Sequence, residues 1–300
     1  MRSQASWALA VACLAALAGA DPRLNVNDAR YFEFHTPDPN DSLNSLANHG
    51  FLPTNGRGVN ITDIILAAFH GYGVSPETSA LITIDGLVES GNSLDFVFNL
   101  EDLQRDSWRI EHDCSFSRPD TFEGAGFGFD QSAWDTVVNL ISDCDKIGPL
   151  CMGRAKAARI RELRQSLNPQ TVYSRAAAAH GATEVGMLLG VFSTARNTQD
   201  RLLFIRSLFE NEAIPRHLGW MPREFLADVE TVLTVGTTSL NADPILQQAD
   251  DGQVASREDV IRAIKPDTSI PLQEMSAVLS GAGFTNPAPF NALRRISQGG

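Results

Sequence analysis

Apolar side chains recur at helical spacing along most of the chain. Between residues 63 and 72 they follow two candidate N-cap residues, Asn60 and Thr62, and they stop before Gly73, a residue type that commonly ends helices. Residues 76–91 form a second helical run framed by a proline and a glycine, because proline is favoured in the first turn and glycine just past the end. The first third of the chain therefore predicts two consecutive helices.

The same periodicity predicts helices through the rest of the chain, and no strand-rich block, repeat or long linker interrupts it. The predicted spans are residues 96–103, 132–141, 153–167, 176–179, 183–196, 200–212, 222–235 and 271–279, with a shorter helix capped at Ser256. We take Gly236 as the end of one of these helices and Glu184 as part of the first turn of another. The pattern indicates an all-α fold with about eight to ten helices around one core.

One of these helices is strongly basic. Five cationic side chains lie within residues 153–167: Arg154, Lys156, Arg159, Arg161 and Arg164. The chain as a whole is acidic, and long basic side chains usually keep their charges in water. We therefore interpret the basic positions as a solvated helix face.

Composition narrows the class of protein and its partners. The chain has 300 residues, of which 43% are hydrophobic, so it can bury a large core. Its formal net charge is −12, and its pI is about 4.9. An acidic surface repels phosphate backbones, so we expect no nucleic-acid partner.

The N-terminal segment has the parts of a secretory signal. A basic residue precedes an apolar run over residues 7–17, and Ala18-Gly19-Ala20 fits the small-residue cleavage rule. No later stretch reaches the roughly 18 unbroken apolar residues of a membrane span. We therefore expect residues 1–20 to be removed. Residues 21–300 are then a secreted, monomeric single domain without a membrane partner.

Two features of the sequence are compatible with secretion: cysteines that can form a disulfide, and glycosylation sequons. Cys114, Cys144 and Cys151 remain after the predicted cleavage. The short loop between Cys144 and Cys151 permits a disulfide without demanding one. Cys114 is then the odd thiol, and a small buried hydrophobe is its simplest interpretation. Sequons begin at Asn40 and Asn60, and each is a weak indication of a surface glycan.

A cluster of potential cation ligands lies near the middle of the chain. Glu111, His112 and Asp113 are followed by Ser115, so a carboxylate, an imidazole and a hydroxyl lie within five residues. Such oxygen-rich sets suit magnesium, calcium or manganese. Zinc fits less well, because no second histidine or cysteine pair lies at ligand spacing. An ordinary polar helix terminus is the alternative interpretation.

Residues 43–53 carry a more specific pattern. They read Leu-Asn-Ser-Leu-Ala-Asn-His-Gly-Phe-Leu-Pro, and Gly56-Arg57 follows. By itself this stretch resembles the end of a helix running into a loop. It also resembles a signature of the fungal haem-thiolate peroxidases, the chloroperoxidase and unspecific peroxygenase family. The resemblance implies a multi-helix, chloroperoxidase-like fold and haem b as cofactor.

The family's axial cysteine is absent from this chain. In the family, a cysteine just before the Leu-Asn pair binds the haem iron. An ungapped alignment puts Asn40 at that position. A gapped alignment instead matches residues 37–42 and leaves a short Pro-Cys-Pro stretch missing before Leu43, and we prefer it because it matches more residues. His49 accompanies the cysteine in the family, so we expect His49 to face elsewhere.

The cation cluster matches a second signature of the same family. Glu111, His112, Ser115, Arg118 and Asp120 align with it without a gap. The resemblance implies that Glu111, His112 and Ser115 hold a magnesium or manganese ion against a haem propionate. It also implies that His112 lies on the distal side, beside a catalytic glutamate.

Glu184 is our candidate for that glutamate. It is the only carboxylate between Arg175 and Arg196. A carboxyl half-buried among apolar neighbours has a raised pKa and can exchange protons near neutral pH. The family uses such a glutamate to move a proton between the two oxygens of a peroxide. Arg175 is a weaker candidate for its charge partner. A glutamate favoured by the dipole at a helix start is the alternative interpretation.

A third match covers residues 208–220, which read Leu-Phe-Glu-Asn-Glu-Ala-Ile-Pro and end in Leu-Gly-Trp. We interpret it as a packing and capping motif. Together the three motifs favour a secreted peroxidase or peroxygenase that uses hydrogen peroxide to oxidise, halogenate or oxygenate a small organic substrate. The missing cysteine keeps two alternatives open. One is a haem-free member that acts on or binds an apolar metabolite, and the other is a binding or structural protein without catalysis.

Overall fold

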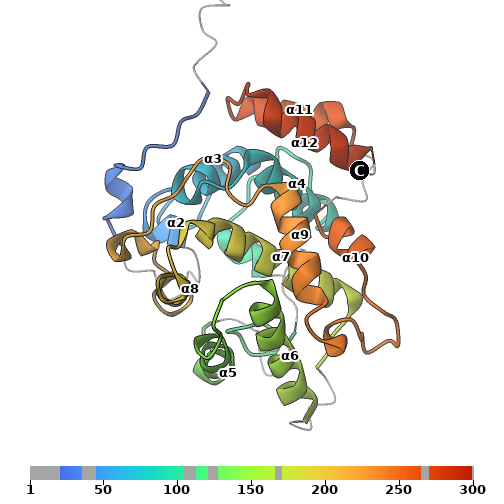
Figure 1. Cartoon of the computed structure of the whole chain (residues 1–300). Coiled ribbons are helices and arrows are strands. Elements are labelled where there is room, and N and C mark those ends of the chain that lie inside the picture. The colour runs from blue at the N-terminus through green and yellow to red at the C-terminus, as the bar shows by residue number, and fades with distance from the viewer. Residues whose placement is uncertain are drawn as a thin grey trace, which may run out of the picture.

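The computed structural model describes residues 21–35, 45–104, 113–120, 128–165, 171–264 and 270–298. Within these ranges the chain forms helices joined by loops, with isolated β-bridges and no strand (Figure 1). This architecture confirms the predicted all-α fold. None of the helices in the described ranges is long and apolar enough to cross a membrane.

The described part of the chain contains eleven α-helices and several short 3₁₀ turns. The α-helices are α2 (Ser45–Asn48), α3 (Ile61–Tyr72), α4 (Pro76–Glu89), α5 (Gln131–Ser142), α6 (Pro149–Gln165), α7 (Arg175–Val191), α8 (Thr198–Asn211), α9 (Val229–Leu240), α10 (Arg257–Arg262), α11 (Leu272–Gly281) and α12 (Pro287–Ser297). Short 3₁₀ turns include η1 (Ala29–Tyr31), η2 (Leu100–Gln104), η5 (Phe192–Thr194), η6 (Pro215–Leu218) and η7 (Pro244–Leu246).

Helix α3 begins and ends where the sequence predicts. Asn60 accepts a hydrogen bond from the Asp63 backbone N–H, and the Asp63 side chain accepts one from the Asn60 N–H. This reciprocal pair satisfies two helix-end donors. Gly73 ends the helix in a left-handed conformation with φ 72°. A Cβ at Gly73 would lie 1.9 Å from the Arg223 carbonyl oxygen, so only glycine fits there.

Helices α7 and α9 pack against each other through glycines. A Cβ on Gly186 of α7 would lie 2.4 Å from the Val232 carbonyl oxygen of α9. A Cβ on Gly236 of α9 would lie 2.7 Å from the Ala182 carbonyl oxygen of α7. The two backbones therefore approach more closely than any side chain would allow. This pair forms the middle of the molecule (Figure 1).

The predicted helix over residues 222–235 is wrong at both ends. The helix begins only at Val229, where Asp228 caps it by accepting a hydrogen bond from the Thr231 N–H at 2.7 Å. It continues through Gly236 to Leu240. Gly236 is present for the close contact with α7, and a packing glycine cannot be told from a terminating glycine by sequence alone.

Two further predictions needed correction. The separate helices expected over 176–179 and 183–196 are one continuous helix, α7, so Glu184 lies in its middle and not in its first turn. The helix expected over 96–103 is instead an isolated bridge between Val59 and Phe98, followed by η2. Two backbone hydrogen bonds between Val59 and Phe98, of 2.8 and 2.9 Å, replace the helical ones.

The cysteines form the disulfide that the sequence permitted and leave one buried thiol. Cys144 and Cys151 form a disulfide that ties the end of α5 to the first turn of α6. Cys114 is a free thiol with no exposed surface. It packs within the same core as Trp134, Trp220 and Phe69.

Candidate functional site

His49 anchors the first motif from a buried position. Its side chain is 4% exposed. Its Nδ1 donates to the Arg30 carbonyl oxygen at 2.9 Å, and its Nε2 accepts from the Ile214 N–H at 3.0 Å. An acceptor role for Nε2 places the proton on Nδ1. Burial lowers the pKa of His49, which keeps the imidazole neutral.

The partners of His49 belong to the third motif. Ile214 lies in that motif, and the neighbouring Asn48 donates from Nδ2 to the Glu212 carbonyl oxygen at 3.2 Å. Glu212 itself takes a left-handed conformation, with φ 47°, at the end of α8. The Asn48-His49 pair therefore ties the first motif to the third. His49 faces this contact, whereas the sequence predicted only that it would not face the position of the iron ligand.

The rest of the third motif packs around two tryptophans. Phe209 stacks on Trp134 with ring centroids 4.7 Å apart, and Trp134 Nε1 donates to Glu210 Oε1 at 2.8 Å. Trp220 is buried and donates from Nε1 to the Val191 carbonyl oxygen at 3.4 Å. These contacts agree with a packing and capping role for the motif.

The second motif is described only in part. Glu111 and His112 lie outside the described residues, whereas residues 113–120 lie within them. Asp113 Oδ2 accepts the Val172 N–H at 2.8 Å. Asp120 is almost fully buried and accepts the Cys114 N–H at 2.9 Å and the Thr171 hydroxyl at 2.5 Å. These carboxylates hold the segment against the chain that leads into α7.

Two basic residues of α6 pack beneath this segment. Arg159 is 3% exposed and donates from Nε to the Ser115 carbonyl oxygen at 3.1 Å. Lys156 is 4% exposed, and its ammonium lies 5.5 Å from the centre of the Phe116 ring. The prediction of a solvated basic face is therefore wrong for these two residues. The sequence could not show that residues 113–120 would cover them.

The other three basic positions of α6 agree with the prediction, because Arg154, Arg161 and Arg164 are exposed. Two of them pair with acidic residues near η7: Arg161 with Asp243 at 2.5 Å, and Arg164 with Asp250 at 2.8 Å. The helix therefore has a conventional solvated face and a second cationic face that points inward.

Lys156 links the second motif to Glu184. Burial lowers the pKa of the Lys156 ammonium, and the negative charge of Glu184 is the largest influence in the opposite direction. A mutual influence of this kind requires the two side chains to be near each other. Lys156 thus lies near both Phe116 and Glu184. Glu184 is exposed, which corrects the expectation of a half-buried carboxyl.

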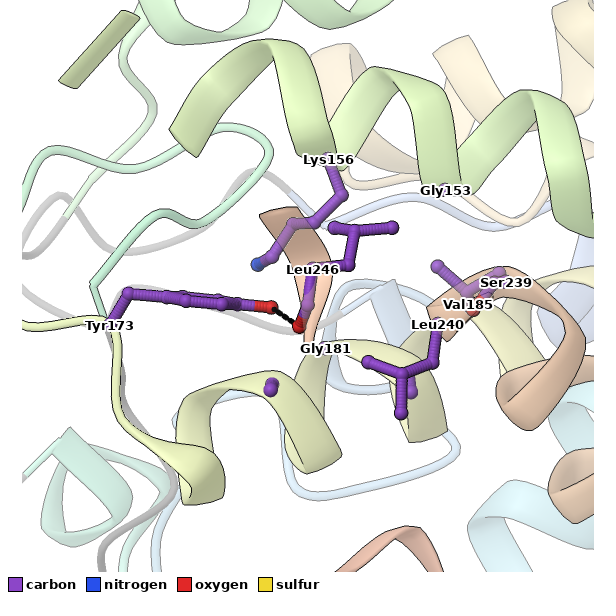
Figure 2. Close-up of a pocket in the computed structure, with 10 residues that line it drawn as sticks. Gly153, Lys156, Tyr173, Gly181, Val185, Ser239, Leu240 and Leu246 are labelled. Carbon is purple, nitrogen blue, oxygen red and sulfur yellow. Dashed lines mark hydrogen bonds between the residues drawn. The ribbon is translucent and has the colours of Figure 1, made fainter. Parts of the chain in front are cut away.

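The Lys156 amino group points into a small cavity (Figure 2). The cavity measures about 10 Å³ and is lined by Tyr173, Gly181 and Val185, among others. Tyr173 donates its hydroxyl proton to the Leu246 carbonyl oxygen at 2.9 Å. A space of this size is just large enough for one water molecule, which can solvate a buried ammonium.

Comparison with known proteins identifies the family. A family model described as "Peroxidase, family 2" matches residues 33–225. The chain belongs to this peroxidase family. It is also 25% identical to the chloroperoxidase of Leptoxyphium fumago over 244 residues. That alignment covers 72% of this chain and 64% of the chloroperoxidase, which is less than two thirds of the relative's length. The family match includes all three motifs and Glu184.

Two residues near Glu184 were missed by the sequence analysis. Lys156 was assigned to the solvent face, and its proximity to Phe116 and Glu184 is visible only in three dimensions. His180 lies four residues before Glu184 on α7, so both side chains project from one face of the helix. The sequence already contained this four-residue spacing, which could have indicated that His180 lies near Glu184. Arg175 instead contacts Gln253 at 2.9 Å and Asp259 at 3.8 Å.

The described residues do not fit a thiolate-ligated haem. Cys144 and Cys151 are joined in a disulfide. Cys114 has no exposed surface, and burial raises the pKa of its thiol to about 12, so the thiol stays protonated. Both nitrogens of His49 already have partners. Asn40, the nearest aligned position for the axial ligand, lies outside the described residues.

The predicted cation site stays a prediction. Among the residues that the structure describes, no group of three His, Cys, Asp or Glu side chains is placed to hold a metal ion. Two of the three predicted ligands, Glu111 and His112, lie outside that part of the chain. The third, Ser115, is held against α6 through its carbonyl oxygen.

Proposed function

We propose that this member of peroxidase family 2 is a secreted oxidoreductase that uses hydrogen peroxide to oxidise, halogenate or oxygenate a small organic substrate. The observation that carries the proposal is the position of Lys156. Its ammonium lies 5.5 Å from the centre of the Phe116 ring in the second-motif segment, and the negative charge of Glu184 opposes the lowering of its pKa by burial. Lys156 therefore lies near parts of both features that the resemblance assigns to the distal site.

In this proposal Glu184 takes a proton from one oxygen of the peroxide and returns it to the other. A nearby ammonium stabilises the ionised carboxylate, so Lys156 favours the form of Glu184 that accepts a proton. His112 assists on the same side, and Glu111, His112 and Ser115 hold a magnesium or manganese ion. The described residues supply no thiolate for haem b. The roles proposed for the residues above are therefore proton transfer and cation binding.

A second candidate function rests on the cysteine inventory. With one disulfide and one fully buried thiol, the mature chain has no cysteine ready to bind iron. A protein of this fold without haem would bind or act on an apolar metabolite. Binding without catalysis, in a secreted binding or structural protein, is the limiting case of this candidate.

A single set of assays distinguishes the two candidate functions. Residues 21–300 are produced in a secretory host supplied with haem, and peroxide consumption is measured for the wild type and for Glu184→Gln. The proposal expects consumption by the wild type and a loss of at least about 100-fold in the variant. Glu274→Gln, which changes an exposed carboxylate of α11, is the matched control and should match the wild type. Equal rates in wild type and Glu184→Gln would refute the role of Glu184.

A further inference from the structure

The segment that leads into α3 carries one of the two glycosylation sequons. Residues 60–62 read Asn-Ile-Thr, and they join the bridge at Val59 to the first turn of α3. Asn60 and Thr62 are both partly exposed. The other sequon begins at Asn40, which lies outside the described residues. The surroundings of Asn60 can therefore be compared with what an attached glycan requires.

Asn60 uses its polar groups to cap α3, with the exception of its side-chain nitrogen. Its Oδ1 accepts the Asp63 N–H at 3.1 Å, and its own N–H donates to Asp63 Oδ2 at 3.0 Å. Its carbonyl oxygen accepts the Ile64 N–H at 3.1 Å. Within the described part of the chain, Nδ2 of Asn60 has no hydrogen-bond partner. An N-linked glycan attaches at Nδ2, so the glycan and the cap would use different atoms.

The bridge between Val59 and Phe98 sets the direction of the Asn60 side chain. Val59 and Phe98 exchange two backbone hydrogen bonds, and both residues are buried, so their side chains point into the core. Successive side chains of an extended segment alternate between its two faces. Asn60 is itself extended, with φ −125° and ψ 173°. Its side chain therefore lies on the outer face of the bridge.

Val97 lies opposite Asn60 on the same outer face. The bridge is antiparallel, so the next residue along each segment pairs Asn60 with Val97. On the other side of the bridge the same register brings the Gly58 N–H to Asn99 Oδ1 at 3.2 Å. Residues directly opposite each other in such a pair have Cβ atoms about 4.5–5.5 Å apart. Val97 is 56% exposed, so an apolar surface lies beside the free nitrogen of Asn60.

We propose that Asn60 carries an N-linked glycan whose first N-acetylglucosamine lies over Val97. A lipid-diphosphate-linked oligosaccharide of the secretory pathway supplies the sugar. The bond between sugar C1 and the diphosphate oxygen breaks, a bond between C1 and Asn60 Nδ2 forms, and the amide proton is transferred to the released lipid diphosphate. The sugar ring then shields the apolar side chain of Val97 from water, which favours the contact. The proposal rests on the proposed secretion of residues 21–300 and requires no peroxidase chemistry.

The occupancy of each sequon is the first measurement. The full chain, with residues 1–20 as its own signal, is expressed in a eukaryotic secretory host. Peptide mapping before and after enzymatic removal of N-glycans in heavy-oxygen water should show a glycan on Asn60 in most molecules. Thr62→Val removes the sequon hydroxyl, and Asn60→Asp removes Nδ2 but keeps a good N-cap. Both variants should lose this glycan completely, whereas Thr62→Ser should keep it.

A double-mutant comparison tests the contact with Val97. Val97→Ser should lower the melting temperature of the glycosylated protein by at least about 2 °C more than it lowers that of Thr62→Val. Asn60→Asp serves as a second background without the glycan. Val254 is 63% exposed, and Val254→Ser is the matched control, which should have the same effect with and without the glycan.

The proposal is overturned if the secreted protein has no glycan on Asn60, including the case in which only Asn40 is occupied. It is also overturned if Val97→Ser has the same effect with and without the glycan. Retention of residues 1–20 would refute secretion, and the glycan with it. Loss of residues 1–20 together with an unmodified Asn60 would refute the glycan alone. None of these results depends on peroxide consumption, so failure of the peroxidase proposal is recognised separately.

Discussion

At the scale of single residues, His49 has a structural role in this fold. Its two ring nitrogens join Arg30 of the N-terminal segment to Ile214 after α8. Both partners are backbone groups, which every residue carries, so the sequence pattern could not identify them. The motif indicated only that the histidine would face away from an iron ligand. The structure supplies the reason, because both ring nitrogens of His49 form hydrogen bonds with backbone groups.

Replacing His49 by alanine should therefore destabilise the fold. The substitution leaves a buried carbonyl oxygen and a buried N–H unpaired and opens a cavity. We expect a loss of about 3–5 kcal/mol in the free energy of unfolding, measured by urea denaturation. His217→Ala removes an exposed imidazole and should stay within about 0.5 kcal/mol of wild type. A change below about 1 kcal/mol in His49→Ala would contradict the assigned contacts.

Lys156 is the second residue whose role depends on burial. Lys156→Met keeps the size of the side chain and removes its charge. The proposed role of Lys156 is to favour the ionised form of Glu184, so its removal raises the pKa of Glu184. The acidic limb of the pH profile for peroxide consumption should then move to higher pH. Arg154→Met, on the exposed face of the same helix, should leave the profile in place. An unmoved profile in Lys156→Met would separate Lys156 from the reaction.

At the scale of elements, local signals were predictable and contacts between helices were not. The N-cap at Asn60 and the stop at Gly73 depend on residues within one turn, so the bounds of α3 follow from the sequence. The roles of Gly236 and Lys156 depend on α7 and on residues 113–120, which are distant in the chain. Glu184 was proposed from its chemistry, and its place in the middle of α7 was missed because residues 176–196 were divided into two helices.

The contact between α7 and α9 can be tested with one methyl group. Gly186→Ala places a Cβ against the Val232 carbonyl oxygen, and backbone cannot give way as a flexible side chain would. We expect the overpacking to outweigh alanine's helix propensity and to cost about 1–3 kcal/mol in the free energy of unfolding. Gly281→Ala, at the end of α11 with no atom within 4 Å, is the control and should be neutral or stabilising. Equal stabilities in chemical denaturation would contradict the close approach.

At the scale of the whole molecule, motifs far apart in sequence are held in one framework. His49 contacts Ile214, and Asp120 contacts Thr171 at the entrance to α7. The family signatures therefore include residues that form long-range contacts within the fold, and not only residues proposed to act in catalysis. This is why the fold could be predicted from sequence, while the assigned catalytic and cation-binding residues stay predictions. Signature residues identify the fold even where the iron-binding cysteine is missing.

The central claim is that this chain keeps the fold of peroxidase family 2 without a thiolate ligand for haem iron. The most direct test is the absorption spectrum of residues 21–300, produced with haem and recorded after reduction and addition of carbon monoxide. We predict bound haem whose Soret band lacks the long-wavelength shift of thiolate ligation. A long-wavelength Soret band would contradict the claim, since Cys114 or a disulfide cysteine would then bind iron. No bound haem would refute the peroxidase proposal and favour the haem-free candidate.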